Sequence, residues 1–451
     1  MNKFKVILAT SKNHILGNNN SIPWLGKYPR DLKYFKKLSS FSPNNEQNIV
    51  IMGRKTWESL PSSKLPHRIP IVISTTMNSS TEYYLADSFD KALELCNSIQ
   101  HNEIFVIGGK SIYEIALNHY KCGEIYHTLI NEEYNGDTKL QIINPKILSE
   151  QIDYDIVFRK IKLQGENKYL RLLSKILNEG EKRHTRNAIT YSIFDEQLVF
   201  DIQDGFPLLT TKKMFWKGIV EELLFFIRGH TDSKLLEEKG VNIWKENTSK
   251  EFLKKCNLPY REGDMGEMYG WNWRHFNTEY KGCDKDYTGK GFDQLVKVIQ
   301  EIKTNPTSRR ILMTDFNPAK AHLGVLYPCH SLILQFYVRE GMILDVKMYQ
   351  RSVDSFLGLP FNISSTSLLL YIIAKLTNTI PGKVTLALGD CHIYSDHLEQ
   401  VKKQLKRLPY NFPILKLPNF NNLNQVENSK LEDYVIENYQ CHKGIKASMI
   451  A

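Results

Sequence analysis

Cys329 stands between Pro328 and His330, just before an apolar run, LILQFYV, whose residue types favour a β-strand. A cysteine in such a place serves as a nucleophile, a zinc ligand, half of a disulfide bond or a small core residue. The chain has seven cysteines at irregular spacing and no C-x-x-C pair. A disulfide framework and a zinc site are therefore disfavoured, and the nucleophile and the core residue remain as interpretations of Cys329.

Arginines near two predicted strands suit a phosphate group. Arg309 and Arg310 precede one strand, and Arg351 and Ser352 follow another. Guanidinium groups and a hydroxyl bind phosphate with several hydrogen bonds, and arginines close to a thiol lower its pKa. The alternative is that they are ordinary surface residues, which is the commoner role of paired arginines.

Three further residues of the second half carry groups that bind a nucleotide. Asn362 follows Pro-Phe in a predicted turn, where its amide can pair with the donor and acceptor of a base edge. His392 and Tyr394 are two residues apart, which places both on one face of an extended segment. A metal site at His392 and His397 lacks a third ligand at a useful spacing.

Glu222 falls on the apolar face of the predicted helix FWKGIVEELLFFIRGHTD. A carboxylate on a buried face is costly unless it is paired or takes part in chemistry. A structural ion pair and a catalytic acid are equally consistent with this position.

In the first half, Asp31 begins an amphipathic helix whose apolar face includes Leu32 and Phe35. A lone acid beside an apolar face can sit in a pocket and take part in a proton transfer. The alternative is an acid that only stabilises the helix N-terminus.

Other residues of the first half suit an anionic dinucleotide. Arg54, Lys55 and Thr56 begin a helix directly after the strand NIVIMG, which is a suitable place for a phosphate monoester. Gly108 and Gly109 follow the strand EIFVI and allow close approach of the backbone to a ligand. Alternatively, the cations are solvated and the glycine pair only serves a turn.

The elements that must position these residues differ between the two halves. In the first half, the strands FKVILA, NIVIMG, IPIVIST and EIFVIGG alternate with helical stretches, which predicts an α/β doubly wound central sheet. After Gly165, long helices and aromatic strands alternate less regularly, which predicts an α+β domain. The predicted domains are residues 1–165 and 166–451.

Length and composition fit a globular protein of two or three domains. The chain has 451 residues, of which 42% are hydrophobic and 24% charged, and no stretch approaches the roughly 18 consecutive apolar residues of a membrane span. The N-terminus is predicted to be a first strand rather than a signal peptide, which favours a cytoplasmic location. The net charge of +10 is spread along the chain, which favours a lysine-rich surface first, anionic substrates second and nucleic acid third.

Residues 1 to about 163 resemble the dihydrofolate reductases, through A-x(12)-I-P-W, D-L-x-Y-F-K, I-M-G-R-x-T-W-E-S-L-P, V-I-G-G and G-D-T in that order. The resemblance implies that Asp31, supported by Thr128, binds the pterin and assists protonation of its nitrogen 5. It implies that Leu32 and Phe35 pack on the folate and that Arg68 pairs with its α-carboxylate. It also implies NADPH as the cofactor, with these contacts: Ala9, Ile22, Arg54, Lys55, Thr56, Ser74, Ile107, Gly108 and Gly109.

Residues 166–451 resemble the thymidylate synthases, through F-P-L-L-T-T-K-K, E-E-L-L-x-F-x-R-G, Y-G-W-N-W-R-H-F, P-T-S-R-R, P-C-H, Y-Q-R-S-x-D, L-G-L-P-F-N-I and L-G-D-C-H-I-Y. The resemblance implies that Cys329 adds to carbon 6 of dUMP and so activates carbon 5 toward methylenetetrahydrofolate. It implies that Glu222 organises proton transfers through water and that Tyr269 lies near the proton-abstraction step. The resemblance implies that His330 supports the catalytic residues without contacting the substrate.

The same resemblance implies two sets of contacts and no metal. The residues that bind dUMP would be Arg186, Arg309, Arg310, Gln350, Arg351, Ser352, Asn362, His392 and Tyr394, with Arg309 and Arg310 supplied by a partner subunit. The residues that bind folate would be Lys212, Trp244, Asp354 and Phe361.

Two segments depart from these family patterns. After NGDTKL, the first half leaves little room for the terminal β-hairpin that usually completes a reductase sheet. In the second half, the phosphate loop EKRHTRNAITYSIF is one residue shorter than the family pattern, so Arg186 matches its arginine with Thr185 as the alternative. Glu267, Phe316 and Tyr327 also stand where other residues are common.

The whole chain resembles the bifunctional dihydrofolate reductase–thymidylate synthases of protists and plants, with a much shorter junction. The synthase releases dihydrofolate, which the reductase returns to tetrahydrofolate, and the resemblance implies a homodimer through the synthase half. Two alternatives are a pyrimidine hydroxymethylase on the same scaffold and a nucleic-acid-binding regulator. The identity of the product would distinguish a hydroxymethylase from a thymidylate synthase. The presence of the full set of catalytic residues argues against a nucleic-acid-binding regulator.

Overall fold

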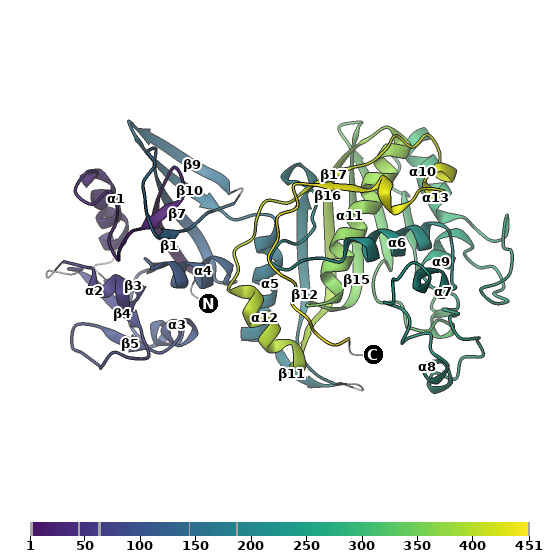
Figure 1. The fold of residues 1–451 in the computed structure, drawn as a ribbon, viewed down its shortest axis with the longest axis horizontal. Helices are drawn as coiled ribbons and strands as arrows, with labels where there is room; N and C mark the ends of the chain where they lie inside the picture. The colour runs from purple at the N-terminus through teal and green to yellow at the C-terminus, as the bar shows by residue number, and fades with distance from the viewer. Residues whose placement is uncertain (1–2, 44–45, 62–64, 144, 186–187, 450–451) are drawn as a thin grey trace. The chain divides into compact units, whose positions relative to one another are not determined.

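The computed structural model describes residues 3–43, 46–61, 65–143, 145–185 and 188–449 (Figure 1). The chain forms two compact units, one of Met1–Lys175 with Lys402–Pro409 and one of Ile176–Val401 with Tyr410–Ala451. The division falls within helix α5 (Glu166–Glu179), and the boundary at residue 165 stays a prediction.

The first unit is built on an eight-stranded sheet in the order β5-β4-β3-β6-β1-β7-β10-β9. Six neighbouring strands are parallel, and β10 and β9 add an antiparallel edge. The strands are β1 (Phe4–Ser11), β3 (Asn48–Gly53), β4 (Arg68–Ile73), β5 (Tyr84–Ala86), β6 (Ile104–Val106), β7 (Cys122–Ile130), β9 (Lys146–Asp153) and β10 (Ile156–Lys162). The short strands β2 (Ile15–Gly17) and β8 (Thr138–Lys139) pair separately.

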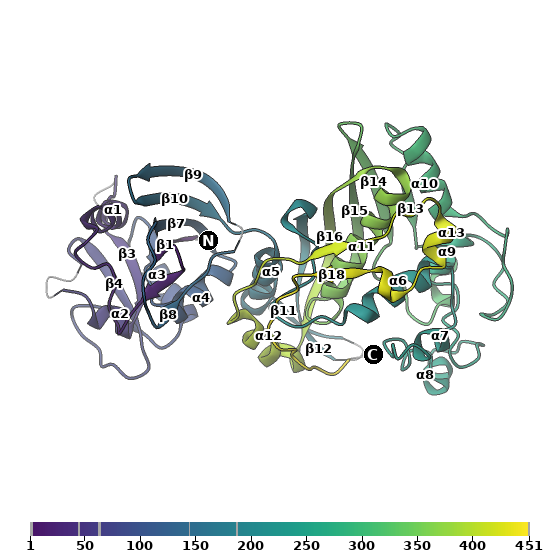
Figure 2. The same cartoon turned by 45° about the horizontal axis from the view of Figure 1, so that its top comes forward.

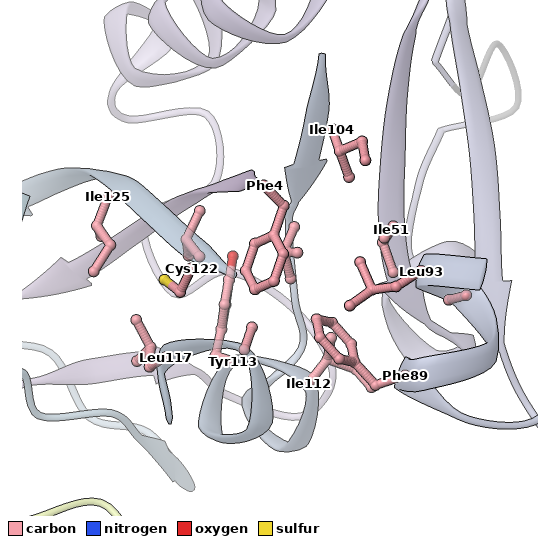
Figure 3. Packing of buried hydrophobic residues seen from close by; sticks show 14 of the residues in the cluster. Phe4, Ile51, Phe89, Leu93, Ile104, Ile112, Tyr113, Leu117, Cys122 and Ile125 are labelled. Carbon is pink, nitrogen blue, oxygen red and sulfur yellow. The ribbon is translucent and has the colours of Figure 1, made fainter. Parts of the chain in front are cut away.

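Helices cover both faces of this sheet, as the alternation of strands and helices predicts. On one face, α3 (Phe89–Ser98) and α4 (Lys110–Asn118) pack on a core that includes Phe4, Ile51 and Ile125 (Figure 3). On the other face, a second core around Val50 and Trp57 is joined by Phe35 and Leu38 of α1 (Pro29–Ser40). α2 (Arg54–Glu58) follows β3 directly. The doubly wound architecture is therefore confirmed.

The terminal hairpin, for which the sequence suggested little room, is present as β9 and β10. It turns at Tyr154, which has a positive φ of 57°. Seven of the eight residues of β9 are exposed, so the strand shows no apolar–polar alternation, and this is why the pattern escaped sequence analysis. The expectation that the first half leaves little room for this hairpin was therefore wrong.

The first unit also contains a segment from far along the chain, residues 402–409. The buried side chain of Asn118, at the end of α4, donates hydrogen bonds to the carbonyl oxygens of Leu405 (2.9 Å) and Arg407 (3.0 Å). Leu408 packs against the core that contains Phe4. This segment therefore completes the first unit.

The second unit is built on a six-stranded sheet in the order β11-β12-β16-β15-β14-β13. The strands are β11 (Glu181–His184), β12 (Ile189–Asp201), β13 (Leu312–Thr314), β14 (Ile333–Arg339), β15 (Ile343–Asp354) and β16 (Ile380–Tyr394), of which only β15 and β16 run parallel to each other. Helix α11 (Gly358–Thr377) packs on β15 and β16 (Figure 2). This mixture confirms the predicted α+β organisation.

Among the described helices, α11 alone is long and apolar enough to cross a membrane by length and composition. Within the unit, 72% of its most apolar window is buried, and it contacts α6 (Trp216–Ile227) and α10 (Gln294–Thr304) as well as the sheet. Its apolar residues therefore form the core of the second unit.

The remaining elements of the second unit are short or lie near the chain end. They are α7 (Lys234–Glu237), α8 (Lys250–Lys255), α9 (Gly270–Arg274), α12 (Leu398–Leu405), α13 (Leu423–Glu427), and the strand pair β17 (Ile414–Lys416) and β18 (Val435–Glu437). α12 begins in this unit and ends in the segment that belongs to the first.

Candidate active sites

Asp31 lies in the first turn of α1 and its side chain is buried. Burial raises the pKa of this carboxyl group, while the Thr128 hydroxyl and the Trp24 indole oppose the rise by favouring the charged form. Thr128 lies on β7 opposite Ala9 of β1. The first unit therefore has a buried acid that holds its proton more tightly than an exposed aspartate does.

The residues that the resemblance places beside Asp31 differ in exposure. Leu32 is 45% exposed and Phe35 is half-buried on the same helix. Arg68 is buried, donates a hydrogen bond to the Ser39 hydroxyl (2.8 Å), and lies 5.7 Å from the centroid of the Phe35 ring. No described carboxylate pairs with Arg68, so part of its guanidinium group remains available to an acidic ligand.

The ends of the parallel strands bring the predicted dinucleotide contacts to one edge of the sheet. The Gly53 N–H at the end of β3 donates to the Gly108 oxygen (2.7 Å), which joins the turn before α2 to the glycine pair. A side chain at Gly108 would lie 2.9 Å from the Tyr113 ring, whose hydroxyl donates to the Ile7 oxygen (2.7 Å). The peptide bond between Gly108 and Gly109 is cis. Only glycine fits at position 108.

The other predicted cofactor contacts lie at or near this edge with differing exposure. Lys55 is exposed, Thr56 is half-buried, and Arg54 pairs with Glu58 of the same helix (3.1 Å). Ser74 follows β4, and its hydroxyl accepts hydrogen bonds from the backbone of Thr76 and Met77 (3.1 Å each), so it already shapes a turn. The two remaining predicted residues are the half-buried Ile107, just after β6, and the exposed Ile22.

In the second unit, Cys329 lies four residues before the start of β14 and is partly buried. Its sulfur is 3.5 Å from the Tyr269 hydroxyl. The Tyr269 ring stacks on His330, with the centroids 4.2 Å apart. Burial raises the pKa of the Cys329 thiol, while the Tyr269 hydroxyl and the positive charge of Arg351 lower it. Burial also lowers the pKa of His330 to about 4, which keeps this imidazole neutral near pH 7.

Arg351 on β15 holds the backbone on the N-terminal side of Cys329. Its guanidinium group donates to the Pro328 (2.7 Å) and Tyr327 (2.9 Å) oxygens, and its backbone N–H donates to the Cys329 oxygen (3.0 Å). The predicted proximity of an arginine to the cysteine is therefore present in the structure.

Glu222, on α6, accepts a hydrogen bond from the indole N–H of Trp244 (2.8 Å). Burial raises the pKa of Glu222 to about 7, and the Trp244 contact opposes the rise. No described cation pairs with Glu222, whereas the neighbouring Glu221 pairs with Lys239 (2.6 Å). The structure thus disfavours the ion-pair interpretation of Glu222.

The parallel pairing of β15 and β16 gathers the predicted nucleotide residues. Ser352 lies opposite Asp390, and Asp354 lies opposite His392. The His392 and Tyr394 rings are 5.1 Å apart on the same strand, as their spacing predicts. Gln350 is buried, and its Oε1 has no partner among the described residues. A carbonyl oxygen in such a position suits a ligand that donates a hydrogen bond.

Asn362 lies in the first turns of α11 and not in a turn between elements. Pro360 sits near the helix N-terminus, where a missing N–H is tolerated, so the Pro-Phe-Asn sequence continues the helix. Phe361 is half-buried beside it. Asp354 precedes this helix and accepts hydrogen bonds from the Phe356 (2.9 Å) and Leu357 (3.2 Å) backbone.

The remaining predicted cations, Lys212, Arg309, Arg310 and Arg186, differ in environment. Lys212 is 6% exposed, donates to the Phe356 oxygen and lies 3.8 Å from the Phe356 ring centroid. Arg309 and Arg310, before β13, are exposed. Arg186 lies outside the described residues.

Sequence analysis missed Asp390. Its carboxylate accepts hydrogen bonds from Ser192 (2.7 Å) and contacts His392 Nδ1 (2.7 Å), and these contacts hold its pKa below the usual range despite burial. The available signal was its spacing of two residues from His392, which places both on one face of β16. Asp390 therefore orients the His392 ring.

The described residues contain no group of three or more His, Cys, Asp or Glu side chains arranged to hold a metal ion.

Two family models match the chain: Dihydrofolate reductase over residues 3–162 and Thymidylate synthase over residues 167–451. A bifunctional dihydrofolate reductase-thymidylate synthase of Paramecium tetraurelia is 40% identical over 99% of this chain and 98% of the relative. The chain belongs to the bifunctional dihydrofolate reductase–thymidylate synthase family. Further members from Arabidopsis thaliana (36% identical, 99% of this chain, 96% of the relative) and Leishmania amazonensis (34%, 99% and 95%) also match.

Membership of this family confirms the principal functional prediction. The chain is an enzyme with a reductase unit and a thymidylate synthase unit, and neither the hydroxymethylase nor the nucleic-acid-binding alternative is favoured. Enzymes of these two families act on small molecules and in general use NADPH and methylenetetrahydrofolate.

Proposed function

We propose that Cys329 is the nucleophile of the synthase reaction in this chain. Its thiolate forms a bond to carbon 6 of dUMP, and the electron pair of the 5,6 double bond moves to carbon 5, which attacks the methylene carbon of the folate. The proton on carbon 5 is then removed, the bond between the methylene carbon and nitrogen 5 of the folate breaks, and the folate leaves as tetrahydrofolate. A hydride from this tetrahydrofolate completes the methyl group, the bond between the Cys329 sulfur and carbon 6 breaks, and dTMP, dihydrofolate and the free cysteine remain. The observation that carries this proposal is the 3.5 Å contact of the Cys329 sulfur with the Tyr269 hydroxyl, with Arg351 bonded to the preceding backbone.

The surrounding groups support the same assignment. Glu222, with its pKa near neutrality, can accept and return protons through water near pH 7. Arg351 and Ser352 would bind the nucleotide phosphate, Gln350 and Asn362 the base, and His392 and Tyr394 the sugar hydroxyl. Lys212 is buried and donates to the Phe356 oxygen just before α11, which supports a role beside Asp354 and Phe361, the other proposed folate contacts of this segment.

In the first unit we propose that Asp31 binds the pterin and supports protonation of nitrogen 5. NADPH, when bound, supplies the hydride. Arg54, Lys55 and Thr56 would hold its 2′-phosphate, Gly108 and Gly109 would let the backbone approach it closely, and Arg68 would pair with the folate α-carboxylate. The unpaired part of the Arg68 guanidinium group supports the last assignment.

The synthase unit is proposed to form a homodimer through the exposed face of its sheet. Leu312, Ile333, Tyr337 and Tyr349 project from neighbouring strands on this face, where Ile333 and Tyr349 are register partners. Ile333 is 46% and Tyr337 is 63% exposed, which is unusual for apolar groups gathered on one sheet face. Arg309 and Arg310 come just before Leu312, so a second copy packed on this face would receive them.

A coupled assay tests the central proposal. Purified protein with dUMP, methylenetetrahydrofolate and NADPH should form dTMP first and then consume NADPH. Cys329→Ala should abolish dTMP formation and leave reduction of added dihydrofolate at the wild-type rate. Thymidylate formation by the Cys329→Ala variant would overturn the proposal.

Mixing of two inactive variants tests the dimer. An Arg309→Ala/Arg310→Ala double variant and Cys329→Ala should each lack synthase activity. Random exchange of subunits should restore about a quarter of the sites, because half of the dimers are mixed and each holds one complete site. A monomer in sedimentation analysis, or no recovery after verified exchange, would contradict this arrangement.

A further inference from the structure

Three positions that depart from the synthase family pattern, Glu267, Phe316 and Tyr327, are gathered at one loop. This loop, residues 315–328, runs from the end of β13 to Cys329 and is called the cysteine loop below. Phe316 and Tyr327 lie near its two ends, and their ring centroids are 5.7 Å apart with the ring planes inclined at 60°. Glu267 comes from the chain before α9 and pairs with Lys320 of the loop (2.8 Å). The departures therefore contact the segment that leads to the proposed nucleophile.

The pair of Glu267 and Lys320 anchors the middle of the cysteine loop. Glu267 is buried, and the Lys320 ammonium group also donates to the Thr278 oxygen (3.0 Å). A little further along, the Tyr260 hydroxyl donates to the Leu323 oxygen (2.7 Å). These contacts hold the loop backbone against the rest of the synthase unit at two points.

At the end of the loop, the ring of Tyr327 lies against the guanidinium group of Arg351. The Arg351 Cζ atom is 5.0 Å from the centroid of the Tyr327 ring, which is within the range of a cation–π interaction. Phe316 contacts the same ring. One face of the Arg351 guanidinium group is therefore covered by an aromatic ring that has a neighbour of its own.

The hydrogen bonds of Arg351 leave one terminal nitrogen for a ligand. Its Nε donates to the Pro328 oxygen (2.7 Å) and its Nη2 to the Tyr327 oxygen (2.9 Å). Among the described residues, none accepts a hydrogen bond from Nη1. Because a guanidinium group is planar, contacts along one edge and over one face fix the direction in which Nη1 points. A phosphate oxygen is a suitable acceptor for this N–H group.

We propose that Tyr327 is a positioning residue for the nucleotide phosphate: its ring covers one face of the Arg351 guanidinium group and so directs Nη1 toward the phosphate of dUMP. The inference rests on the proposed role of Arg351. The ring lies against the group that binds the phosphate, while the Arg351 backbone N–H donates separately to the Cys329 oxygen (3.0 Å). Loss of the ring should therefore weaken nucleotide binding and leave the chemical step unchanged.

The first test separates KM for dUMP from kcat. Tyr327→Ala removes the ring, and KM for dUMP should rise about threefold to fivefold while kcat stays within about twofold of wild type. Tyr327→Phe keeps the ring face and should keep the wild-type KM. Tyr327→Leu keeps apolar bulk without a ring face and should behave as Tyr327→Ala. A wild-type KM in the Ala or Leu variant, a Phe variant as impaired as Ala, or a fall in kcat alone would overturn the proposal.

The second test measures the phosphate contact by itself, with inorganic phosphate as a competitor of dUMP. In Tyr327→Ala the Ki of phosphate should rise by the same factor as KM for dUMP. The Ki of deoxyuridine, which has no phosphate, should stay at the wild-type value. An equal rise for both competitors would show that Tyr327 acts on the whole site and would overturn the proposal.

Tyr154→Ala is the matched control for these measurements. It removes an exposed tyrosine whose ring centroid lies 5.3 Å from an arginine Cζ, that of Arg30 in the first unit. This variant should leave KM for dUMP and the Ki of phosphate unchanged. An equal rise of both constants in Tyr154→Ala and Tyr327→Ala would overturn the proposal.

The third test is a double-mutant cycle with Arg351→Ala, followed by the Kd for dUMP in calorimetry. If Tyr327 acts through Arg351, adding Tyr327→Ala to Arg351→Ala should raise Kd by less than about twofold. A further rise of about twofold or more would show an independent action of the ring and would overturn the proposal. Wild-type dUMP affinity in Arg351→Ala alone would instead overturn the proposed role of Arg351, so the two failures are distinguishable.

Discussion

Each unit contains an acid that lies beside an indole and whose pKa burial raises, but the surroundings of the two acids differ. Asp31 lies at the start of a helix, with Thr128 and Trp24 favouring its charged form. Glu222 lies in the middle of a helix, and its one opposing contact is Trp244. Both have raised pKa values because of burial. The comparison teaches that burial raises the pKa of an acid in each unit, while neighbouring donor groups oppose the rise in both: Thr128 and Trp24 at Asp31, and Trp244 at Glu222.

Replacement of Asp31 should have the largest effect. Asp31→Asn removes the ionisable group and should lower dihydrofolate reduction by about 10²–10³-fold without changing dTMP formation. The measurement is the initial rate of NADPH consumption with dihydrofolate. Asp87→Asn, which changes an exposed aspartate paired with Lys91, is the matched control and should keep the wild-type rate. Equal rates of dihydrofolate reduction in the two variants would show that Asp31 takes no part in the reaction.

Glu222→Gln should lower synthase kcat by about 10²-fold, because the amide cannot relay a proton. The same substitution should also stabilise the synthase unit.

The pKa of Glu222 in the folded protein, about 7, lies above the usual glutamate value, so the charged form opposes folding. The free energy of unfolding of the wild type therefore falls as pH rises from about 4.5 to 7. The gain in the free energy of unfolding for the Gln variant should therefore grow over that window to about 1–2 kcal/mol.

Glu221→Gln is the control for this prediction because it changes the neighbouring residue, which pairs with Lys239. Its loss of an ion pair should destabilise the unit at pH 8, in the opposite direction to Glu222→Gln. Denaturant unfolding of both variants at pH 5 and pH 8 measures the difference. A Glu222→Gln variant that is less stable than wild type at pH 8 would contradict burial as the main cause of the raised pKa of Glu222.

A smaller effect is expected at Asp390. Asp390→Asn weakens the contact that orients His392, so KM for dUMP should rise about tenfold with little change in kcat. Steady-state kinetics with dUMP as the varied substrate measures this. Asp396→Asn changes an exposed aspartate of the same region and should leave KM unchanged. A fall in kcat alone would argue against an orienting role.

The smallest effect is expected for Thr128, whose replacement tests how a neighbouring hydroxyl affects the pKa of Asp31. Thr128→Val removes a hydroxyl that lowers the pKa of Asp31, so the apparent pKa in the pH profile of dihydrofolate reduction should rise by about 0.5–1 unit, with a change of about threefold in rate at neutral pH. Thr10→Val is the control, since the Thr10 hydroxyl contacts His127 and not Asp31. A profile that moves to lower pH would contradict the opposing role of Thr128.

Much of this arrangement follows from local sequence. Asp31, Arg54 and the Gly108–Gly109 pair stand at ends of strands or helices that short apolar patterns predict, and the parallel sheet brings those ends to one edge. The roles of these residues and of Cys329 were predicted from the family resemblance. Lys212, by contrast, was expected to bind folate, and nothing in its local sequence indicated that it would be buried.

The features that escaped sequence analysis depend on contacts between distant segments. Asp315 is a buried acid just after β13, and nothing near it in the chain shows that the Asn272 side chain lies 3.4 Å from its carboxyl oxygen. Strand β9 has almost no buried side chain, so its periodicity carries no signal. The helical position of Asn362 shows that a proline near a helix N-terminus continues the helix rather than ending it.

The segment 402–409 that completes the first unit has a consequence for synthesis of the protein. During translation, the Asn118 amide cannot form its hydrogen bonds to Leu405 and Arg407 until these residues leave the ribosome. They are synthesised more than two hundred residues after the rest of that unit. At about 5–20 residues per second the delay is about 10–50 s. A fragment cut at the end of the reductase sequence would therefore resemble the nascent chain before this segment arrives, with Asn118 unpaired and the core around Phe4 open where Leu408 belongs.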